Sequence, residues 1–124
     1  MPLEANPASR RVDPPAEIRG TARLVSAIVA SAFAIRADEI CGVGRGGAAA
    51  AFARQVAIYL SHTRLGLSYT AAGSLFGRDR TTAAHACRTV EDKREDPRVD
   101  MILDCLERAV DLWPGLARGR GRAT

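Results

Sequence analysis

The chain has 124 residues, which suggests one domain with short tails. A hydrophobic content of 47% excludes a disordered chain, and an aromatic content of only 5% together with abundant alanine favours helices over strands. The net charge of +4 is a modest basic excess and is, by itself, only a weak indication of a nucleic-acid partner.

The distribution of charge along the chain says more than its sum. Residues 54–88 carry five arginines and one acid, residues 89–113 carry four basic and eight acidic side chains, and residues 114–124 carry three arginines and no acid. We therefore expect a folded domain with a basic side and an acidic side. Arginine outnumbers lysine 17 to 1. Two explanations remain open: selection for bidentate contacts with phosphate and guanine, or the codon usage of a GC-rich genome.

Residues 1–15 are rich in Pro, Ala and Arg, and we expect them to form a mobile leader. They contain no apolar core typical of a secretory signal, and the longest apolar-rich run, residues 24–35, is too short to span a bilayer. The expected location is the cytoplasm, where the three cysteines stay reduced.

The following hundred residues, 16–115, are predicted to form a compact all-α orthogonal bundle of about five helices. Apolar residues recur at helical spacing, and four glycines within residues 42–47 interrupt the pattern with a loop that holds at most one short turn, at 38–41. The expected helices cover residues 16–35, 48–63, 68–76, 79–94 and 98–113, with Pro97 marking the end of the fourth and a basic, disordered tail at 116–124.

Some packing expectations follow from the same periodicity. Small cysteines such as Cys41 and Cys105 are expected in the core, and Trp113 either seals the bundle or contacts a partner. In the first helix the stripe is expected to run through Leu24, Ile28 and Ala32. In the last helix the apolar stripe is expected to run through Met101, Leu103, Cys105, Leu106, Val110 and Leu112.

Residues 66–94 have the organisation of a helix-turn-helix. Ser68 can cap a short first helix, Gly77 supplies a tight turn, and the Asp79 carboxylate can cap a longer second helix by accepting from the backbone N–H of Thr81 or Thr82. In this motif the second helix lies in the major groove, with its N-terminal residues on base edges.

The second helix divides into two faces by its period. Ala83, Ala86 or Cys87, and Val90 are expected to pack, whereas Arg80, Thr81, Thr82, His85 and Arg88 are expected to be exposed. Arg80 can read guanine through two parallel hydrogen bonds, the threonine methyls can pack on thymine, and Arg78 and Arg88 are suited to phosphates. The alternative is an ordinary amphipathic helix whose polar face is only solvated.

At these residues the chain resembles domain IV, the DNA-binding domain of the bacterial replication initiator DnaA. That family has Arg-Gln followed by A-x-Y-L, then L-S, F-G-G-R-D-H-T-T and H-A-x-x-K-I. The matching positions are Arg54-Gln55, Ala57, Tyr59-Leu60, Leu67-Ser68, Gly73, Phe76-Gly77, Arg78-Asp79, Thr81-Thr82 and His85-Ala86. The resemblance is close over about 54–97. It implies that Arg54, Asp79, Thr81, Thr82 and the following polar positions contact double-stranded DNA of the DnaA-box kind.

Three departures from the family pattern bear on DNA readout. Arg80 replaces the family's histidine, a single Gly77 replaces two glycines, and the loop before Arg54 has lost most of its basic residues. Ala48 stands where the family sends an arginine into the minor groove, so that contact is either lost or carried by Arg45 or by the arginines at 118–122.

The sequence contains no G-x-x-x-x-G-K-[ST] motif, so we expect neither ATPase activity nor a cofactor. No metal site is expected, because His85 and Cys87 stand two residues apart and do not face one another on a helix. No activating motif surrounds a cysteine or histidine, and enzymatic activity is not expected, although a Cys–His nucleophile pair stays open.

Two functions compete at this point. The first is sequence-specific binding of double-stranded DNA by a nucleoid-associated monomer that controls replication or transcription; its candidate residues are Arg45, Arg54, Ser68, Arg78, Asp79, Arg80, Thr81, Thr82, His85 and Arg88. The second is a protein-interaction adaptor that keeps the fold, binds DNA weakly or not at all, and docks a partner on its last helix. Monomeric binding is expected because no long heptad seam is visible.

Overall fold

A computed structural model describes residues 16–41 and 47–113 of the chain. Over these ranges it contains helices and no strand, which confirms the predicted all-α class. The helices are α1 (Ala16–Phe33), α2 (Ala37–Cys41), α3 (Gly47–Thr63), α4 (Tyr69–Ser74), α5 (Arg80–Lys93) and α6 (Pro97–Leu112). The sixth helix, relative to the five expected, is α2, at the predicted turn. The predicted leader, Arg45 and the predicted tail lie outside the described residues.

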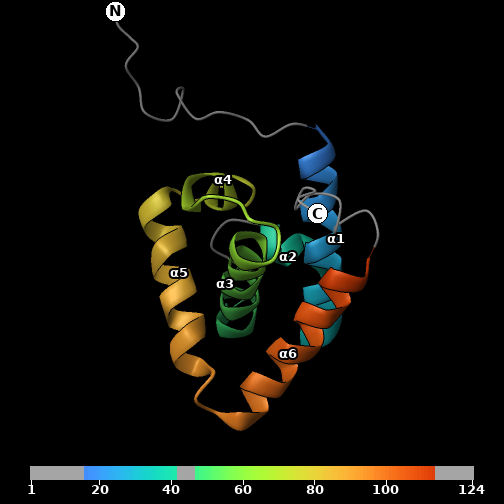
Figure 1. The fold of residues 1–124 in the computed structure, drawn as a ribbon, viewed down its shortest axis with the longest axis vertical. Coiled ribbons are helices and arrows are strands. Elements are labelled where there is room, and N and C mark those ends of the chain that lie inside the picture. The colour runs from blue at the N-terminus through green and yellow to red at the C-terminus, as the bar shows by residue number, and fades with distance from the viewer. Residues whose placement is uncertain (1–15, 42–46, 114–124) are drawn as a thin grey trace, which may run out of the picture.

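The long helix α3 occupies the centre of the bundle (Figure 1). It contacts α1, α2, α4, α5 and α6, and every residue from Val56 to Ser61 is buried. Alanines such as Ala53 and Ala57 allow neighbouring helices to approach it closely, since a methyl group adds little volume. In Figure 1, α5 lies on one side of α3, α1 and α6 lie on the other, and α4 crosses near one end. None of the described helices is long and apolar enough to cross a membrane.

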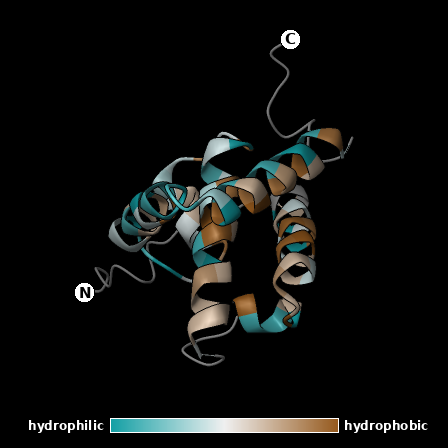
Figure 2. Ribbon diagram, turned by 90° about the horizontal axis from the view of Figure 1, so that it is seen from below, coloured by the Kyte–Doolittle hydropathy of each residue, from teal (hydrophilic) through white to brown (hydrophobic). Residues whose placement is uncertain are grey.

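Helix α6 packs differently from the prediction. Leu103, Leu106 and Val110 are buried, but Met101 and Leu112 are 64% and 79% exposed. The expected stripe is therefore wrong for three of its six members, because Cys105 is exposed as well. Apolar residues surround α6 on most sides, so its period could not select the buried face; contact with α1 and α3 does so. Figure 2 shows hydrophobic and hydrophilic residues interleaved along this helix.

Two smaller expectations also need correction. Trp113 is 46% exposed and so does not seal the bundle, and Ala32 on α1 is exposed at the end of its predicted stripe. The Cys41 side chain lies outside the described residues. Helix α5 ends at Lys93, before Pro97 as predicted. This proline is also the first residue of α6, where the missing N–H has no partner to lose, and Asp96 caps that helix.

Arg94 fixes the corner between α5 and α6. Its guanidinium contacts Asp100 at 2.6 Å, Glu107 at 2.8 Å and the Tyr59 hydroxyl at 3.1 Å. Burial opposes the charged form, but the hydrogen bonds that Arg94 donates to Glu107, Asp100 and the Tyr59 hydroxyl outweigh it and raise the pKa of Arg94. One side chain thus ties α6 to α3 and α5.

Candidate nucleic-acid interface

The first helix of the predicted motif, α4, is short and capped as expected. The Ser68 hydroxyl accepts from Ala71 N at 3.1 Å. The helix ends at Ser74, and Gly77 then turns the chain with a φ of 70°, a left-handed conformation that glycine adopts without strain. The predicted roles of Ser68 as cap and Gly77 as turn residue are confirmed.

Gly73 brings α4 and α5 together. A Cβ atom at this position would lie 2.7 Å from the Arg78 carbonyl oxygen, 2.9 Å from that of Asp79 and 3.2 Å from Ala83 Cβ. The Gly73 carbonyl also accepts the backbone N–H groups of Phe76 and Arg78, both at 2.9 Å. This glycine is needed for space, and it determines how closely the two helices of the motif pack.

Helix α5 begins at Arg80, directly after its cap. Asp79 Oδ1 accepts from Thr82 N at 2.8 Å, which is one of the two partners that the sequence allowed. The negative charge of the carboxylate also interacts favourably with the positive end of the helix dipole. The cap therefore fixes the first turn of α5, the part of the helix that carries Arg80, Thr81 and Thr82.

The two predicted faces of α5 are present. Ala83, Ala86, Cys87 and Val90 are buried against α3 and α4. Burial, followed by the charge of Glu91, raises the pKa of the Cys87 thiol to about 11, so this thiol is neutral in the folded protein at physiological pH. The residues predicted to be exposed are exposed: Arg80, Thr81, Thr82, His85 and Arg88.

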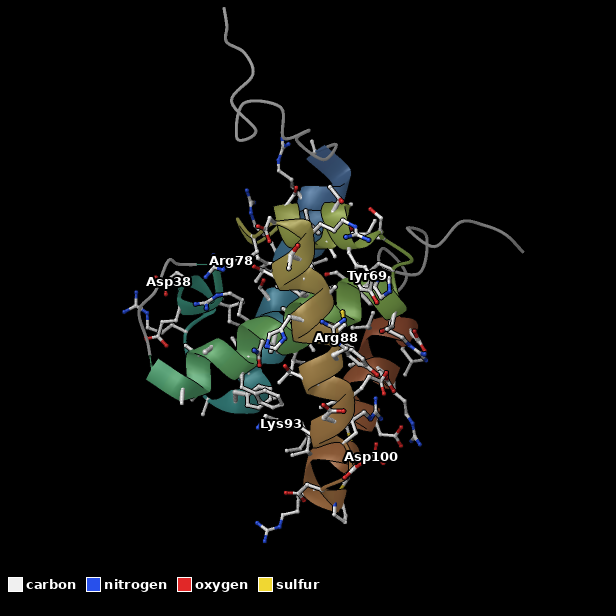
Figure 3. All side chains as sticks on the ribbon, turned by 90° about the vertical axis from the view of Figure 1, so that its left-hand side faces the viewer. Asp38, Tyr69, Arg78, Arg88, Lys93 and Asp100 are labelled. Carbon is white, nitrogen blue, oxygen red and sulfur yellow. The ribbon has the colours of Figure 1, made fainter. Side chains whose placement is uncertain are left out.

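This exposed face is positively charged. Among the described residues, neither Arg80 nor Arg88 forms an ion pair. Figure 3 shows α5 running down the front of the molecule, with Arg88 along its length and Arg78 beside its first turn. Arg78 is half-buried, and its Nη1 donates to the Phe76 carbonyl at 2.9 Å, so part of this guanidinium serves the turn.

Arg54 lies deeper than the other candidates. Its side chain is buried, and its Nε and Nη2 donate to the carbonyls of Ile40 and Glu39 at 2.7 and 3.0 Å. These carbonyls belong to α2, so Arg54 joins α2 to α3. The same residue lines a surface hollow of about 110 Å³ between α3 and α5.

That hollow also contains residues that sequence reasoning missed. Gln55 and Ala51 line it from α3, together with Arg78, Thr82 and His85 from the motif. Ala51, Arg54, Gln55 and Ile58 follow one another at helical spacing, which was the available signal. Outside the hollow, the Thr89 hydroxyl lies 3.5 Å from His85 Nε2, one turn along α5. The hollow brings Arg54 next to the first two turns of α5.

Comparison with known proteins identifies the family. Residues 22–90, more than half of the chain, match the family described as the bacterial DnaA protein helix-turn-helix. The chain belongs to this family. It contains the DNA-binding helix-turn-helix of bacterial DnaA, as the resemblance of residues 54–97 predicted.

Curated DnaA proteins are similar to the chain over the same region. The chromosomal replication initiator protein DnaA of Bifidobacterium animalis subsp. lactis is 38% identical over 73 residues, 58% of this chain and 12% of that protein. DnaA 2 of Chlamydia muridarum is 37% identical over 67 residues, 54% of this chain and 14% of that protein. DnaA of Lachnoclostridium phytofermentans is 32% identical over 96 residues, 76% of this chain and 21% of that protein. The matched region thus spans 12% to 21% of the length of these DnaA relatives.

Proposed function

We propose that the chain binds double-stranded DNA sequence-specifically through α4 and α5, and controls replication initiation or transcription without ATPase activity. The observation that carries the proposal is the first turn of α5. There, Arg80, Thr81 and Thr82 are exposed on a helix whose opposite side is buried and whose start is fixed by Asp79. A rigid, cationic helix N-terminus of this kind fits the major groove.

The candidate side chains divide into those that contact base edges and those that contact phosphates. Arg80 reads guanine in a bidentate contact, while Thr81 and Thr82 contact base edges or thymine methyls. Ser68, Arg78 and Arg88 contact phosphates on either side and set the register without reading sequence. His85 lies one turn beyond Thr81, where it reaches a base edge or a neighbouring phosphate.

Arg54 acts from the hollow between α3 and α5. Two of its nitrogens are engaged by the carbonyls of α2. We therefore assign it a phosphate contact at the edge of the groove, combined with a structural role. Because Ala48 stands at the family's minor-groove position, Arg45 is the candidate for that contact by its nearness in the sequence, with the arginines at 118–122 as the alternative. The binder is cytoplasmic and nucleoid-associated, and it needs no cofactor.

The experiment is fluorescence anisotropy with a random-sequence duplex pool at two salt concentrations, followed by selection and sequencing of the bound fraction. The proposal predicts an enriched motif, a negative salt slope and a specificity ratio of at least about 10³. No enrichment, with affinity no better than about 10⁻⁴ M at physiological salt, would contradict it and favour the adaptor function.

The adaptor function has one specific observation in its favour, the exposed apolar residues of α6. Substitutions on α5 separate the two functions in cells. The readout is whether each variant complements a cell that lacks the wild-type chain. If Arg80→Ala and Thr81→Ala abolish complementation, DNA binding is the function; if they leave it unchanged, the adaptor function is favoured.

A further inference from the structure

Helix α6 exposes a second apolar surface, separate from the α5 face. We call it the α6 stripe and define it as the exposed residues Met101, Ile102, Cys105, Ala109, Leu112 and Trp113. Their spacing places them on one side of the helix, next to the buried stripe of Leu103, Leu106 and Val110, with Ile102 one turn before Leu106. Met101 and Leu112 stand about 16 Å apart along the axis. Contiguous exposed apolar surface of this kind marks an interaction site.

We infer that the α6 stripe is the interface of a homodimer in which α6 of one copy packs antiparallel on α6 of a second copy. The α6 stripe is complementary in shape to a second, antiparallel copy of itself. Its bulky residues lie at the two ends, Met101 and Ile102 at one and Leu112 and Trp113 at the other, with the small Cys105 and Ala109 between. Two such helices can cross closely at their small middles, while the bulky ends fill the diverging gap, as an isologous two-fold contact requires.

Charge complementarity supports the same register. When Met101 faces Leu112 of the second copy, Arg108 lies beside Asp104 of the second copy, and the symmetry repeats the pair. Within one copy these two side chains are 77% and 55% exposed and form a loose contact of 3.7 Å, and Asp104 forms a second loose contact of 3.8 Å with Arg94. A dimer would thus place two additional Arg–Asp pairs at the border of an apolar contact.

The dimer leaves the DNA-binding face accessible. Helices α5 and α6 diverge from the corner at residues 94–96 and lie on different sides of α3 (Figure 1). The inference is therefore independent of the proposed function, and it replaces the sequence-based expectation of a monomer.

The test is sedimentation equilibrium of the full 124-residue chain in the absence of DNA. We expect the average mass to rise with concentration from 13.2 kDa towards twice that value. Met101→Glu and Leu112→Glu each place a charge in both copies of the interface and should raise the dimer dissociation constant at least about tenfold. Both residues are exposed, so helix content and Tm should stay as in the wild type. Thr70→Glu is the matched control, because it adds the same charge at an exposed position of α4, away from the α6 stripe, and it should leave dimerisation unchanged.

A charge swap tests the register itself. Asp104→Arg and Arg108→Asp should each weaken the dimer, and the double substitution should restore it. A chain that stays monomeric at millimolar concentration would overturn the inference, as would a dimer that is indifferent to Leu112→Glu or a double swap that fails to restore association. Fluorescence anisotropy with a duplex that carries one binding site distinguishes dimerisation through α6 from DNA binding through α5. The Leu112→Glu variant should bind this duplex with the same affinity as the wild type.

Discussion

Helices α5 and α6 differ in whether their charged side chains are neutralised by oppositely charged neighbours. On α6 and at the corner before it, acids and arginines neutralise one another: Arg94 contacts Asp100, Asp104 and Glu107, and Arg64 contacts Asp111 at 2.7 Å. On α5, Arg80 in the first turn and Arg88 further along are exposed, and neither has such a carboxylate among the described residues. The same residue type thus stabilises the fold in one region and is available to an anionic ligand in the other.

The two regions therefore differ in how much of their charge is left for a ligand. Residues 89–113 look acidic in the sequence, yet in the structure four of their eight acids lie within 4 Å of Arg64 or Arg94. Within residues 16–41 and 47–113, Arg80 and Arg88 of α5 have no carboxylate partner. The basic side of the molecule is therefore the side that retains its electrostatic attraction for phosphates.

The largest expected effect comes from breaking the packing of α4 on α5. Gly73→Val places a side chain within 3 Å of two backbone carbonyl oxygens, and we expect the free energy of unfolding to fall by about 3 kcal/mol or more. Urea denaturation measures it. Gly20→Ala is the matched control, because a Cβ there meets nothing within 4 Å; on α1 it should stabilise by up to about 1 kcal/mol. Equal effects at the two glycines would contradict the close approach.

A smaller effect is expected at the corner that holds α6. Arg94→Met leaves Glu107, whose side chain is 14% exposed, without its cation, and should lower the free energy of unfolding by about 2–3 kcal/mol. Arg36→Met removes an ion pair with Asp38 whose side chains are 76% and 66% exposed, and should leave the free energy of unfolding almost unchanged. If Arg36→Met were as costly as Arg94→Met, the clamp at the corner would not be structural.

The smallest effect concerns the buried side of α5. Because burial raises the pKa of Cys87 from 9.0 to about 11, the unfolded chain loses this proton before the folded chain does. Stability is then complete below pH 9 and falls as the pH rises towards 11, by less than about 2 kcal/mol. Urea unfolding of Cys87→Ala from neutral pH to pH 11 should show a shallower decline. Burial also raises the pKa of Tyr59, so some decline should remain. An unchanged slope would show that Cys87 is not protected.

Local signals made most of the interface predictable. Ser68, Gly77 and Asp79 act through backbone geometry and hydrogen bonds within a few residues, so their types and spacing are sufficient to place the turn and both caps. The packed and exposed faces of α5 were equally predictable, because polar and apolar residues on this helix segregate by period.

The remainder depends on tertiary contacts that no local pattern encodes. Arg94 meets partners from α3 and α6 that lie up to 35 residues away in the chain. Arg54 was matched as a DNA contact, but its bonds to the carbonyls of α2 appear only when that short helix is in place. On α6 the choice between Leu103 and Met101 as core residues is made by α1 and α3, which cover one side only.

The proposed function requires that the first turn of α5 reads the DNA sequence. Titration of Arg80→Ala and Arg98→Ala against the selected duplex and its single-base variants tests this requirement. Arg98→Ala is the control, because it removes the same charge at an exposed position of α6. We expect Arg80→Ala to weaken binding by about 10-fold to 100-fold and to relax the preference at one base pair, while Arg98→Ala changes affinity by less than about twofold. If the two variants lose the same affinity, or if Arg80→Ala keeps the full base preference, α5 is not the helix that reads the sequence.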